Sequence, residues 1–268
     1  MKNVFTIAGS DSSGGAGIQA DIKTMGALGV HGMSVITAIT AQNSLGVQKS
    51  FPLTPEIIGE QLESLFSDIE IDGVKIGMVS DIEIIKIIRE KLLKYSAKNI
   101  VIDTVMVSKN GYHLLKPEAI EELKSLISIS TLVTPNIPEA EILSDMKIKT
   151  QEDVKKACIE IAKLGVKAVL IKGGHSDENS CTDTLYFEKS FYYYTTPRLE
   201  NKNTHGTGCT LSSAITTFLA KDKSIPISVE LGKKYITKAI ENSFDLGHGI
   251  GPLGHFVEIY KRLGIKYW

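Results

Sequence analysis

The chain has 268 residues, of which 30 are Lys or Arg and 31 are Asp or Glu, so its formal net charge is −1. This balance argues against a nucleic-acid-binding protein, which usually carries a basic excess, and against a polybasic membrane anchor. Hydrophobic residues make up 43% of the chain, enough for a sizeable core, and no apolar run reaches the roughly 18–20 residues that span a bilayer, so we expect no membrane association.

Short apolar, β-branched runs alternate with amphipathic stretches along the chain. Buried strands are predicted at Val4–Ala8, Met33–Ile39, Gly73–Gly77, Ile100–Asp103, Thr131–Val133 and Lys167–Ile171. Helices are predicted between them, beginning with Ile18–Leu28, and Pro55 and Pro117 are typical of first helical turns. Near the C-terminal side, Leu185–Glu188 and Phe191–Thr196 flank a short polar turn and predict a hairpin.

Repeated alternation of strand and helix predicts right-handed βαβ units, and hence an α/β fold with a mostly parallel sheet covered on both faces. The sequence contains no Gly/Ser-rich or Pro-rich tract, charge block or internal repeat that would divide it, so we expect residues 1–268 to form a single domain. In such sheets, ligands bind at the carboxyl ends of the strands. Functional residues are therefore expected in the loops that follow the predicted strands.

The first predicted strand runs into a glycine-rich loop, Gly9–Gly17, which precedes a predicted helix. Glycines let the backbone approach a ligand closely, and a helix N-terminus favours anionic or polar groups. The loop does not fit the G-x-G-x-x-G spacing, because Ala20 stands where the third glycine belongs, and the P-loop pattern is absent from the chain. On these residues alone, a tight strand–helix turn and a ligand-binding loop are equally good interpretations.

A second glycine-rich segment, Asn203–Thr210, precedes an apolar helix predicted at Leu211–Ala220. Gly206 and Gly208 can expose consecutive backbone N–H groups, which together with the helix dipole form an anion cradle. Cys209 is expected in the first turn of the helix, where the pKa of its thiol should fall below the free value of about 8.5. The alternative is a buried structural cysteine beside a turn, but the coincidence of glycines, small polar residues and a helix start favours a functional site.

Charged and polar side chains follow three further strands. Asp103 ends one strand, and Asn136 and Glu139 lie in the loop after the next, where carboxylates can hold Mg²⁺, directly or through its waters, beside phosphates. A helix or turn cap remains the alternative for Asp103, and a first-turn position after Pro138 is the alternative for Glu139. Lys172 also ends a strand, where a lysine can meet a phosphate, although an exposed loop lysine is the commoner case.

Several other site types find no support. The six histidines lack the H-E-x-x-H spacing of a catalytic zinc site, and the G-x-S-x-G motif of a Ser–His–Asp hydrolase is absent. The three cysteines, Cys158, Cys181 and Cys209, are too few for a disulfide framework and form no C-x-x-C pair. Because the N-terminal residues also show no secretory signal, we expect a cytoplasmic protein.

Taken together, these segments resemble the hydroxymethylpyrimidine/phosphomethylpyrimidine kinases of thiamine biosynthesis. The resemblance covers nearly the whole chain in the expected order. It is carried by Ala8–Asp21, Ala41–Asn43, Lys75–Met78, Asp103–Met106, Thr134–Ala140, Lys172–His175, Asn203–Thr210 and Gly247–Pro252. It implies the ribokinase-like fold, a three-layer α/β/α sandwich with a mostly parallel central sheet, and a homodimer.

The resemblance also implies an activity. The reaction would be ATP- and Mg²⁺-dependent phosphorylation of 4-amino-5-hydroxymethyl-2-methylpyrimidine to its monophosphate, and then of the monophosphate to the diphosphate. By the same resemblance, the residues that line the pyrimidine pocket would be Gly9, Asp21, Gln42, Met78 and Val105.

The resemblance further implies where the phosphates bind. Asp103 and Glu139 would serve the metal and phosphates, and Lys172 and Asn136 would serve the nucleotide together with Thr207. The anion hole would be formed by Gly206, Thr207 and Gly208, with Cys209 near the acceptor hydroxyl.

Pyridoxine and pyridoxal kinases of vitamin B6 salvage share parts of this pattern. Gln42 favours the pyrimidine substrate, because an amide presents one donor and one acceptor to an aminopyrimidine edge that the pyridine ring of vitamin B6 lacks. Activity toward vitamin B6 nevertheless stays open at this point. A catalytically inactive ligand-binding regulator on the same fold is a further alternative, against which the intact Asp103, Glu139 and G-T-G-C segment argue.

Cys209 stands where ribokinase-like sugar kinases carry an aspartate that acts as a base. The second acceptor would be a phosphate monoester, which is already anionic, and two unit charges roughly 4 Å apart repel by about 4 kcal/mol at an effective dielectric constant near 20. We hypothesise that a neutral thiol at this position permits both phosphorylations in one pocket.

Overall fold

The computed structural model describes residues 1–107, 111, 114–173 and 180–266. Gly174 and His175, at the end of the Lys172–His175 motif, lie outside the described residues. The strands are β1 (Asn3–Asp11), β2 (His31–Asn43), β3 (Gly46–Pro52), β4 (Gly73–Ile76), β5 (Ile100–Ile102), β6 (Leu132–Val133), β7 (Ala168–Ile171), β8 (Ser180–Phe187) and β9 (Ser190–Pro197). The helices are α1 (Gly17–Ala27), α2 (Pro55–Asp68), α3 (Ile82–Lys94), α4 (Ile120–Ile127), α5 (Ile137–Ser144), α6 (Gln151–Ala162), α7 (Thr207–Ala220), α8 (Ile225–Glu241) and α9 (Val257–Leu263).

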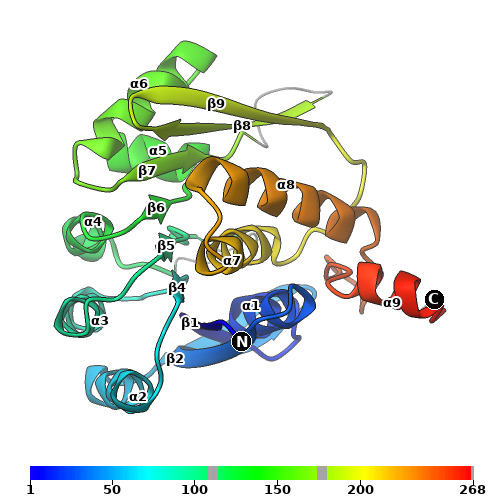
Figure 1. Cartoon of the computed structure of the whole chain (residues 1–268), viewed down its shortest axis with the longest axis horizontal. Coiled ribbons are helices and arrows are strands. Elements are labelled where there is room, and N and C mark those ends of the chain that lie inside the picture. Colours follow the sequence, from blue (N-terminus) through cyan, green and yellow to red (C-terminus); the bar gives the residue numbers. More distant parts are fainter. Residues whose placement is uncertain (108–110, 112–113, 174–179, 267–268) are drawn as a thin grey trace.

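The strands of the described chain form one sheet in the order β3-β2-β1-β4-β5-β6-β7-β8-β9 (Figure 1). The six strands from β2 to β7 in this order pair in parallel, whereas β3, β8 and β9 pair antiparallel with their neighbours. The predicted mostly parallel sheet is therefore confirmed. The chain leaves β1 toward β2 on one side and later returns to β4 on the other, which makes the carboxyl ends of β1 and β4 a switch point where ligands bind in such sheets.

Helices cover both faces of the sheet, as the predicted three-layer sandwich requires (Figure 1). The helices α1, α7 and α8 pack together on one face, and α2 to α6 lie along the other. No described helix is long and apolar enough to cross a lipid bilayer.

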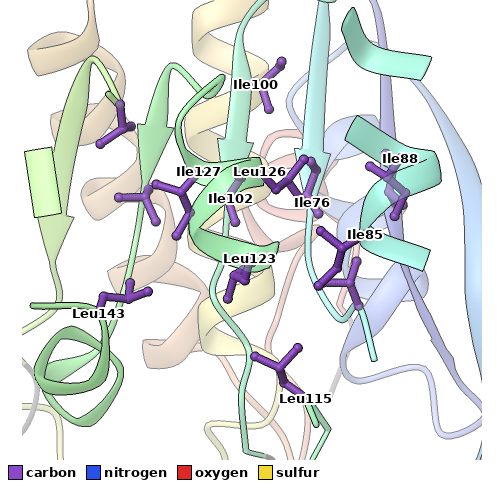
Figure 2. Packing of buried hydrophobic residues seen from close by; sticks show 14 of the residues in the cluster. Ile76, Ile85, Ile88, Ile100, Ile102, Leu115, Leu123, Leu126, Ile127 and Leu143 are labelled. Carbon is purple, nitrogen blue, oxygen red and sulfur yellow. The ribbon is translucent and has the colours of Figure 1, made fainter. Parts of the chain in front are cut away.

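The larger core lies between the sheet and α2 to α6. Figure 2 shows Ile76 of β4 and Ile102 of β5 facing this layer, with Ile85 of α3 and Leu126 of α4 among the buried side chains that pack there. The neighbouring strand residue Val101 points the other way and packs in the smaller core under α7, because successive side chains of a strand alternate between its faces. This two-sided burial explains the nearly continuous apolar runs of the central strands.

The predicted local signals agree with most of the observed elements. Thr54 caps α2 by accepting a hydrogen bond from Ile57 N, and Pro55 occupies the first turn. The hairpin of β8 and β9 is confirmed and is longer than predicted. Pro117 begins a single 3₁₀ turn, Pro117–Ala119, that leads into α4.

Strand β3 was not predicted. It is an edge strand that pairs with the end of β2, and its central residues Gln48 and Lys49 are exposed. Its composition lacks the apolar run by which the other strands were predicted, because an edge strand with little packing on either face needs none. The pairing also extends β2 to Asn43, beyond the predicted end at Ile39.

Candidate active site

A cavity of about 970 Å³ opens at the carboxyl ends of the parallel strands. It lies over the switch point, where the loops after β1, β4, β5, β6 and β7 meet the N-terminus of α7. All the predicted site residues except Asp21 line it: Gly9, Gln42, Met78, Asp103, Val105, Asn136, Glu139, Lys172, Gly206, Thr207, Gly208 and Cys209. The cavity thus brings together side chains that are almost 200 positions apart in the sequence.

The two glycine-rich loops fit against each other on one side of the cavity. Gly206 has φ +83°, and a Cβ at this residue would overlap the carbonyl oxygen of Gly15. A Cβ at Gly15 would in turn overlap the ring of His205. Glycine is therefore required at Gly206 for the two backbones to approach this closely, and a side chain in place of Gly15 would displace the His205 ring. The contact holds the N-terminus of α7, with its positive dipole end, at the wall of the cavity.

Burial raises the pKa of the Cys209 thiol to about 11, although Lys75 and a hydrogen bond from the Gly17 backbone favour the thiolate. The predicted lowering of this pKa is therefore wrong. The loss of hydration outweighs the favourable electrostatic effect of the helix N-terminus, because a thiolate in this position would give up its contact with water. The thiol is neutral at pH 7.

Asp103 and Lys172 form an ion pair beneath the first turn of α7. Lys172 Nζ lies 2.8 Å from Asp103 Oδ1, and the two side chains are 18% and 3% exposed. A Cβ at Gly208 would lie 3.0 Å from Asp103 Oδ2 and 3.6 Å from Lys172 Nζ, so the pair is directly below the proposed cradle. Burial lowers the pKa of Lys172, but the charges of Asp103 and Glu139 outweigh this and raise it. Lys172 is therefore a charged, partly enclosed lysine, unlike the exposed loop lysine of the alternative.

Asn136 and Glu139 form a capping box at the start of α5. Asn136 Oδ1 accepts from Glu139 N at 2.9 Å, and Glu139 Oε2 accepts from Asn136 N at 2.9 Å and from Thr104 Oγ1 at 2.9 Å. The alternative of a first-turn role for Glu139 is thus observed, while its carboxylate also lines the cavity. Burial raises the pKa of Glu139. The positive charge of Lys172 lowers this pKa, and the negative charge of Asp103 raises it further, so that the pKa is raised overall.

No group of three or more His, Cys, Asp or Glu side chains within the described ranges could hold a metal ion by itself. Mg²⁺ does not need such a cage, because it is usually bound through one or two carboxylates, waters and substrate phosphates. Asp103 and Glu139 both line the cavity and supply oxygen atoms of this kind. The donor set therefore fits a magnesium ion that is held jointly with a phosphorylated ligand.

Asp21 differs from its predicted role, since it does not line the cavity. Its side chain is fully buried, and Asp21 Oδ2 accepts from Lys75 Nζ at 2.8 Å and from Thr6 Oγ1 at 2.6 Å. Asp21 Oδ1 accepts from Ser213 Oγ of α7 at 2.7 Å. The carboxylate joins β1, α1, β4 and α7.

Comparison with known proteins identifies the family. The family described as "Phosphomethylpyrimidine kinase" matches residues 11–254. The hydroxymethylpyrimidine/phosphomethylpyrimidine kinase of Escherichia coli is 43% identical over 95% of this chain and 97% of its own. The enzyme of the same name from Bacillus subtilis is 45% identical over 98% of this chain and 97% of its own. The chain belongs to the phosphomethylpyrimidine kinase family.

Solved structures agree with this membership. The phosphomethylpyrimidine kinase of Clostridium difficile superposes with a TM-score of 0.80 at 51% identity, covering 90% of this chain and 100% of that one. An ADP complex of Bacillus subtilis pyridoxal kinase superposes with a TM-score of 0.89 at 38% identity, covering 95% of this chain and 97% of that one. The expected fold and the resemblance to thiamine-biosynthesis kinases are both confirmed.

Three cavity residues of this phosphomethylpyrimidine kinase homologue were missed by the sequence analysis. Asp11, Thr40 and His205 lie beside Gln42 at the wall formed by the two glycine-rich loops and β2. His205 precedes Gly206 in the second glycine-rich segment, and this place in the motif was the one sequence signal that pointed to a site residue. It carried little weight because the partner Asp11 is 194 residues away.

Gly206→Ala is expected to abolish most kinase activity. The added Cβ would overlap the Gly15 carbonyl oxygen and would sit on a residue at φ +83°, so the N-terminus of α7 must move away from the first glycine-rich loop. We expect kcat/KM to fall by at least about 100-fold, the range seen when one donor to a developing charge is removed. Gly26→Ala, in α1 with open space around its Cβ position, is the matched control and should retain activity.

Proposed function

We propose that residues 1–268 form one kinase domain that phosphorylates 4-amino-5-hydroxymethyl-2-methylpyrimidine and then its monophosphate, with ATP and Mg²⁺. The observation that carries the proposal is the set of residues that line the cavity at the carboxyl ends of the strands. The cavity wall presents the Gln42 amide, which matches an aminopyrimidine edge, and beside it the α7 N-terminus over the Asp103–Lys172 pair. An acceptor alcohol and a polyphosphate can therefore bind side by side.

The proposed mechanism relies on position and charge, because phosphoryl transfer needs little covalent chemistry from the protein. The N–H groups at the start of α7 would face the oxygens of the transferring phosphoryl group, and Lys172 would neutralise part of its charge. When bound, Mg²⁺ would neutralise further phosphate charge, and Asp103 and Glu139 are the residues that would hold it. The neutral Cys209 thiol would border the acceptor without repelling it.

Substrate profiling tests this function. The purified enzyme is given ATP and MgCl₂ with the pyrimidine alcohol, with its monophosphate, or with pyridoxal, and ADP release and the phosphorylated product are measured. We expect turnover of both pyrimidines and loss of turnover when Mg²⁺ is removed with a chelator. If neither pyrimidine is phosphorylated under conditions where the enzyme binds ATP, the proposed function is wrong.

A pyridoxal kinase activity is the second candidate, and a specific similarity favours it. The pyridoxal kinase from Staphylococcus aureus in complex with pyridoxal superposes with a TM-score of 0.89 at 37% identity. The pyridoxal arm of the same profile decides between the two. Because pyridoxal lacks the paired donor and acceptor edge of an aminopyrimidine, we expect its kcat/KM to be lower than that of the pyrimidine alcohol.

We further propose that the protein is a cytoplasmic homodimer. Ile39 of β2 and Phe51 of β3 are direct cross-strand partners, so they lie on one face of the edge hairpin, and they are 52% and 50% exposed. A second copy of the chain would cover this apolar face. The three unpaired cysteines fit a reducing compartment. Light scattering should give a mass twice that of the 29.2 kDa chain, and Phe51→Lys should reduce the measured mass to that of one chain.

A further inference from the structure

Four polar side chains, Gln42 among them, form a continuous chain at the wall of the cavity. His205 Nε2 lies 2.8 Å from Asp11 Oδ2 and 3.2 Å from the Gln42 amide nitrogen. On its other side, the Gln42 amide oxygen lies 3.1 Å from Thr40 Oγ1, whose hydroxyl donates to Ser10 O at 2.7 Å. Each group in this chain limits what its neighbour can donate or accept.

Asp11 fixes the proton on His205. The carboxylate is nearly buried and already accepts hydrogen bonds from the backbone N–H groups of Ser13, Gly15 and Ala16. Burial favours its neutral form, but hydrogen bonds from His205 and Ser13 outweigh this and lower the pKa of Asp11 to about 2. An ionised carboxylate can only accept hydrogen bonds. His205 must therefore carry a proton on Nε2 and donate a hydrogen bond from it to Asp11.

This proton decides how the Gln42 amide lies. With the amide nitrogen toward His205, two N–H donors would face each other across 3.2 Å. Turning the amide by half a turn about its Cγ–Cδ bond removes the conflict, since the Gln42 oxygen then shares the His205 Nε2–H with Asp11 in a bifurcated hydrogen bond. The amide nitrogen then donates to Thr40, whose oxygen accepts because its single proton is given to Ser10. The orientation of a side-chain amide is decided by its hydrogen-bond partners in this way.

We infer that Asp11 and His205 are positioning residues that fix which end of the Gln42 amide donates and which accepts, and that they thereby set the specificity for an aminopyrimidine. The oriented amide keeps one N–H and one lone pair for a ligand, which match the ring nitrogen acceptor and the amino donor of the pyrimidine. The inference rests on the proposed function, since it concerns how that substrate is chosen. Thr40 does not fix the polarity alone, because a hydroxyl can donate or accept.

A substrate with the opposite polarity tests the inference. The analogue in which an oxo group replaces the 4-amino group presents an N–H donor and a carbonyl acceptor in reversed order. We measure the ratio of kcat/KM for the amino substrate to that for the oxo analogue in wild type, His205→Phe and His205→Gln. Phe keeps a planar ring without a donor, whereas Gln keeps an N–H that can reach Asp11. Calorimetric dissociation constants for both pyrimidines supply the same ratio if turnover is lost.

Wild type is expected to prefer the amino substrate by at least about 100-fold, because a buried polar site rejects a mismatched partner strongly. In His205→Phe this ratio should fall by about tenfold or more, mainly through KM, and His205→Gln should keep it within about threefold of wild type. An equal loss for both pyrimidines in His205→Phe, with the ratio unchanged, would show a merely structural histidine and overturn the inference.

Two further outcomes keep the test decisive. If His205→Phe does not fold, Asp11→Asn removes the acceptor that fixes the His205 proton, and its ratio should also fall, whereas an unchanged ratio there would overturn the inference. If wild type phosphorylates neither pyrimidine and binds neither, it is the proposed function that fails. Wild-type turnover with an unchanged ratio in the variants refutes the role of Asp11 and His205 alone.

Discussion

Cys209→Asp is expected to slow the phosphorylation of the monophosphate at least tenfold more than the phosphorylation of the alcohol. The thiol is neutral, since burial raises its pKa to about 11, so it adds no negative charge beside the proposed acceptor site. A carboxylate in its place would face a phosphate monoester that carries about −1.5 to −2 charges at pH 7. For unit charges roughly 4 Å apart the repulsion is about 4 kcal/mol at an effective dielectric constant near 20, whereas the neutral alcohol escapes it.

The measurement is a separate assay of each step, with kcat/KM for each acceptor compared between wild type and variant. Cys209→Ser and Cys209→Ala are the matched neutral controls, and both steps should change by similar factors in them. A rate near wild type in Cys209→Ala would mean that the thiol is no base and only occupies space. Equal slowing of the two steps in Cys209→Asp would refute the charge argument.

Much of the fold and most of the cavity were predictable because they depend on local patterns. Buried strands show apolar runs, and the residues just after parallel strands meet at one edge whatever the loops between them do. This rule places Asp103, Glu139 and Lys172 in one cavity from their positions alone. The glycine-rich segment at Gly206 was likewise visible, since its helix start and small residues are neighbours in sequence.

The features that were not predictable depend on distant contacts. The motif predicts that Asp21 lines the pocket, but Asp21 pairs with Lys75, which is 54 positions away, and both side chains are fully buried. The pairing of His205 with Asp11 joins residues 194 positions apart. The pKa of Cys209 was predicted from its helix position, whereas burial by other elements decides it. Sequence patterns report faces and termini, and they do not report which distant groups meet.

Lys75→Met is expected to destabilise the protein by about 3–5 kcal/mol, the cost of removing one partner from a buried ion pair. Lys75 and Asp21 are both 0% exposed, and their nitrogen and oxygen lie 2.8 Å apart. Burial lowers the pKa of Lys75, but the charge of Asp21 outweighs this and raises it, so the lysine stays charged. Without it, the Asp21 carboxylate keeps only the hydroxyl donors of Thr6 and Ser213 in a setting closed to water.

Urea unfolding of a paired set of variants separates this cost from a general loss of packing. Lys86→Met removes a lysine that is 54% exposed and paired with Glu83, and should change the free energy of unfolding by less than about 0.5 kcal/mol. Adding Asp21→Asn to Lys75→Met should recover at least about 1 kcal/mol, because the second change removes the uncompensated charge. If the two losses simply added, Asp21 and Lys75 would not be coupled, and the buried pair would contribute no more than the packing of two side chains. Recovery in the double variant would instead show that the charge of Asp21 itself requires Lys75, which is why β4 tolerates a lysine in a strand that is otherwise apolar and fully buried.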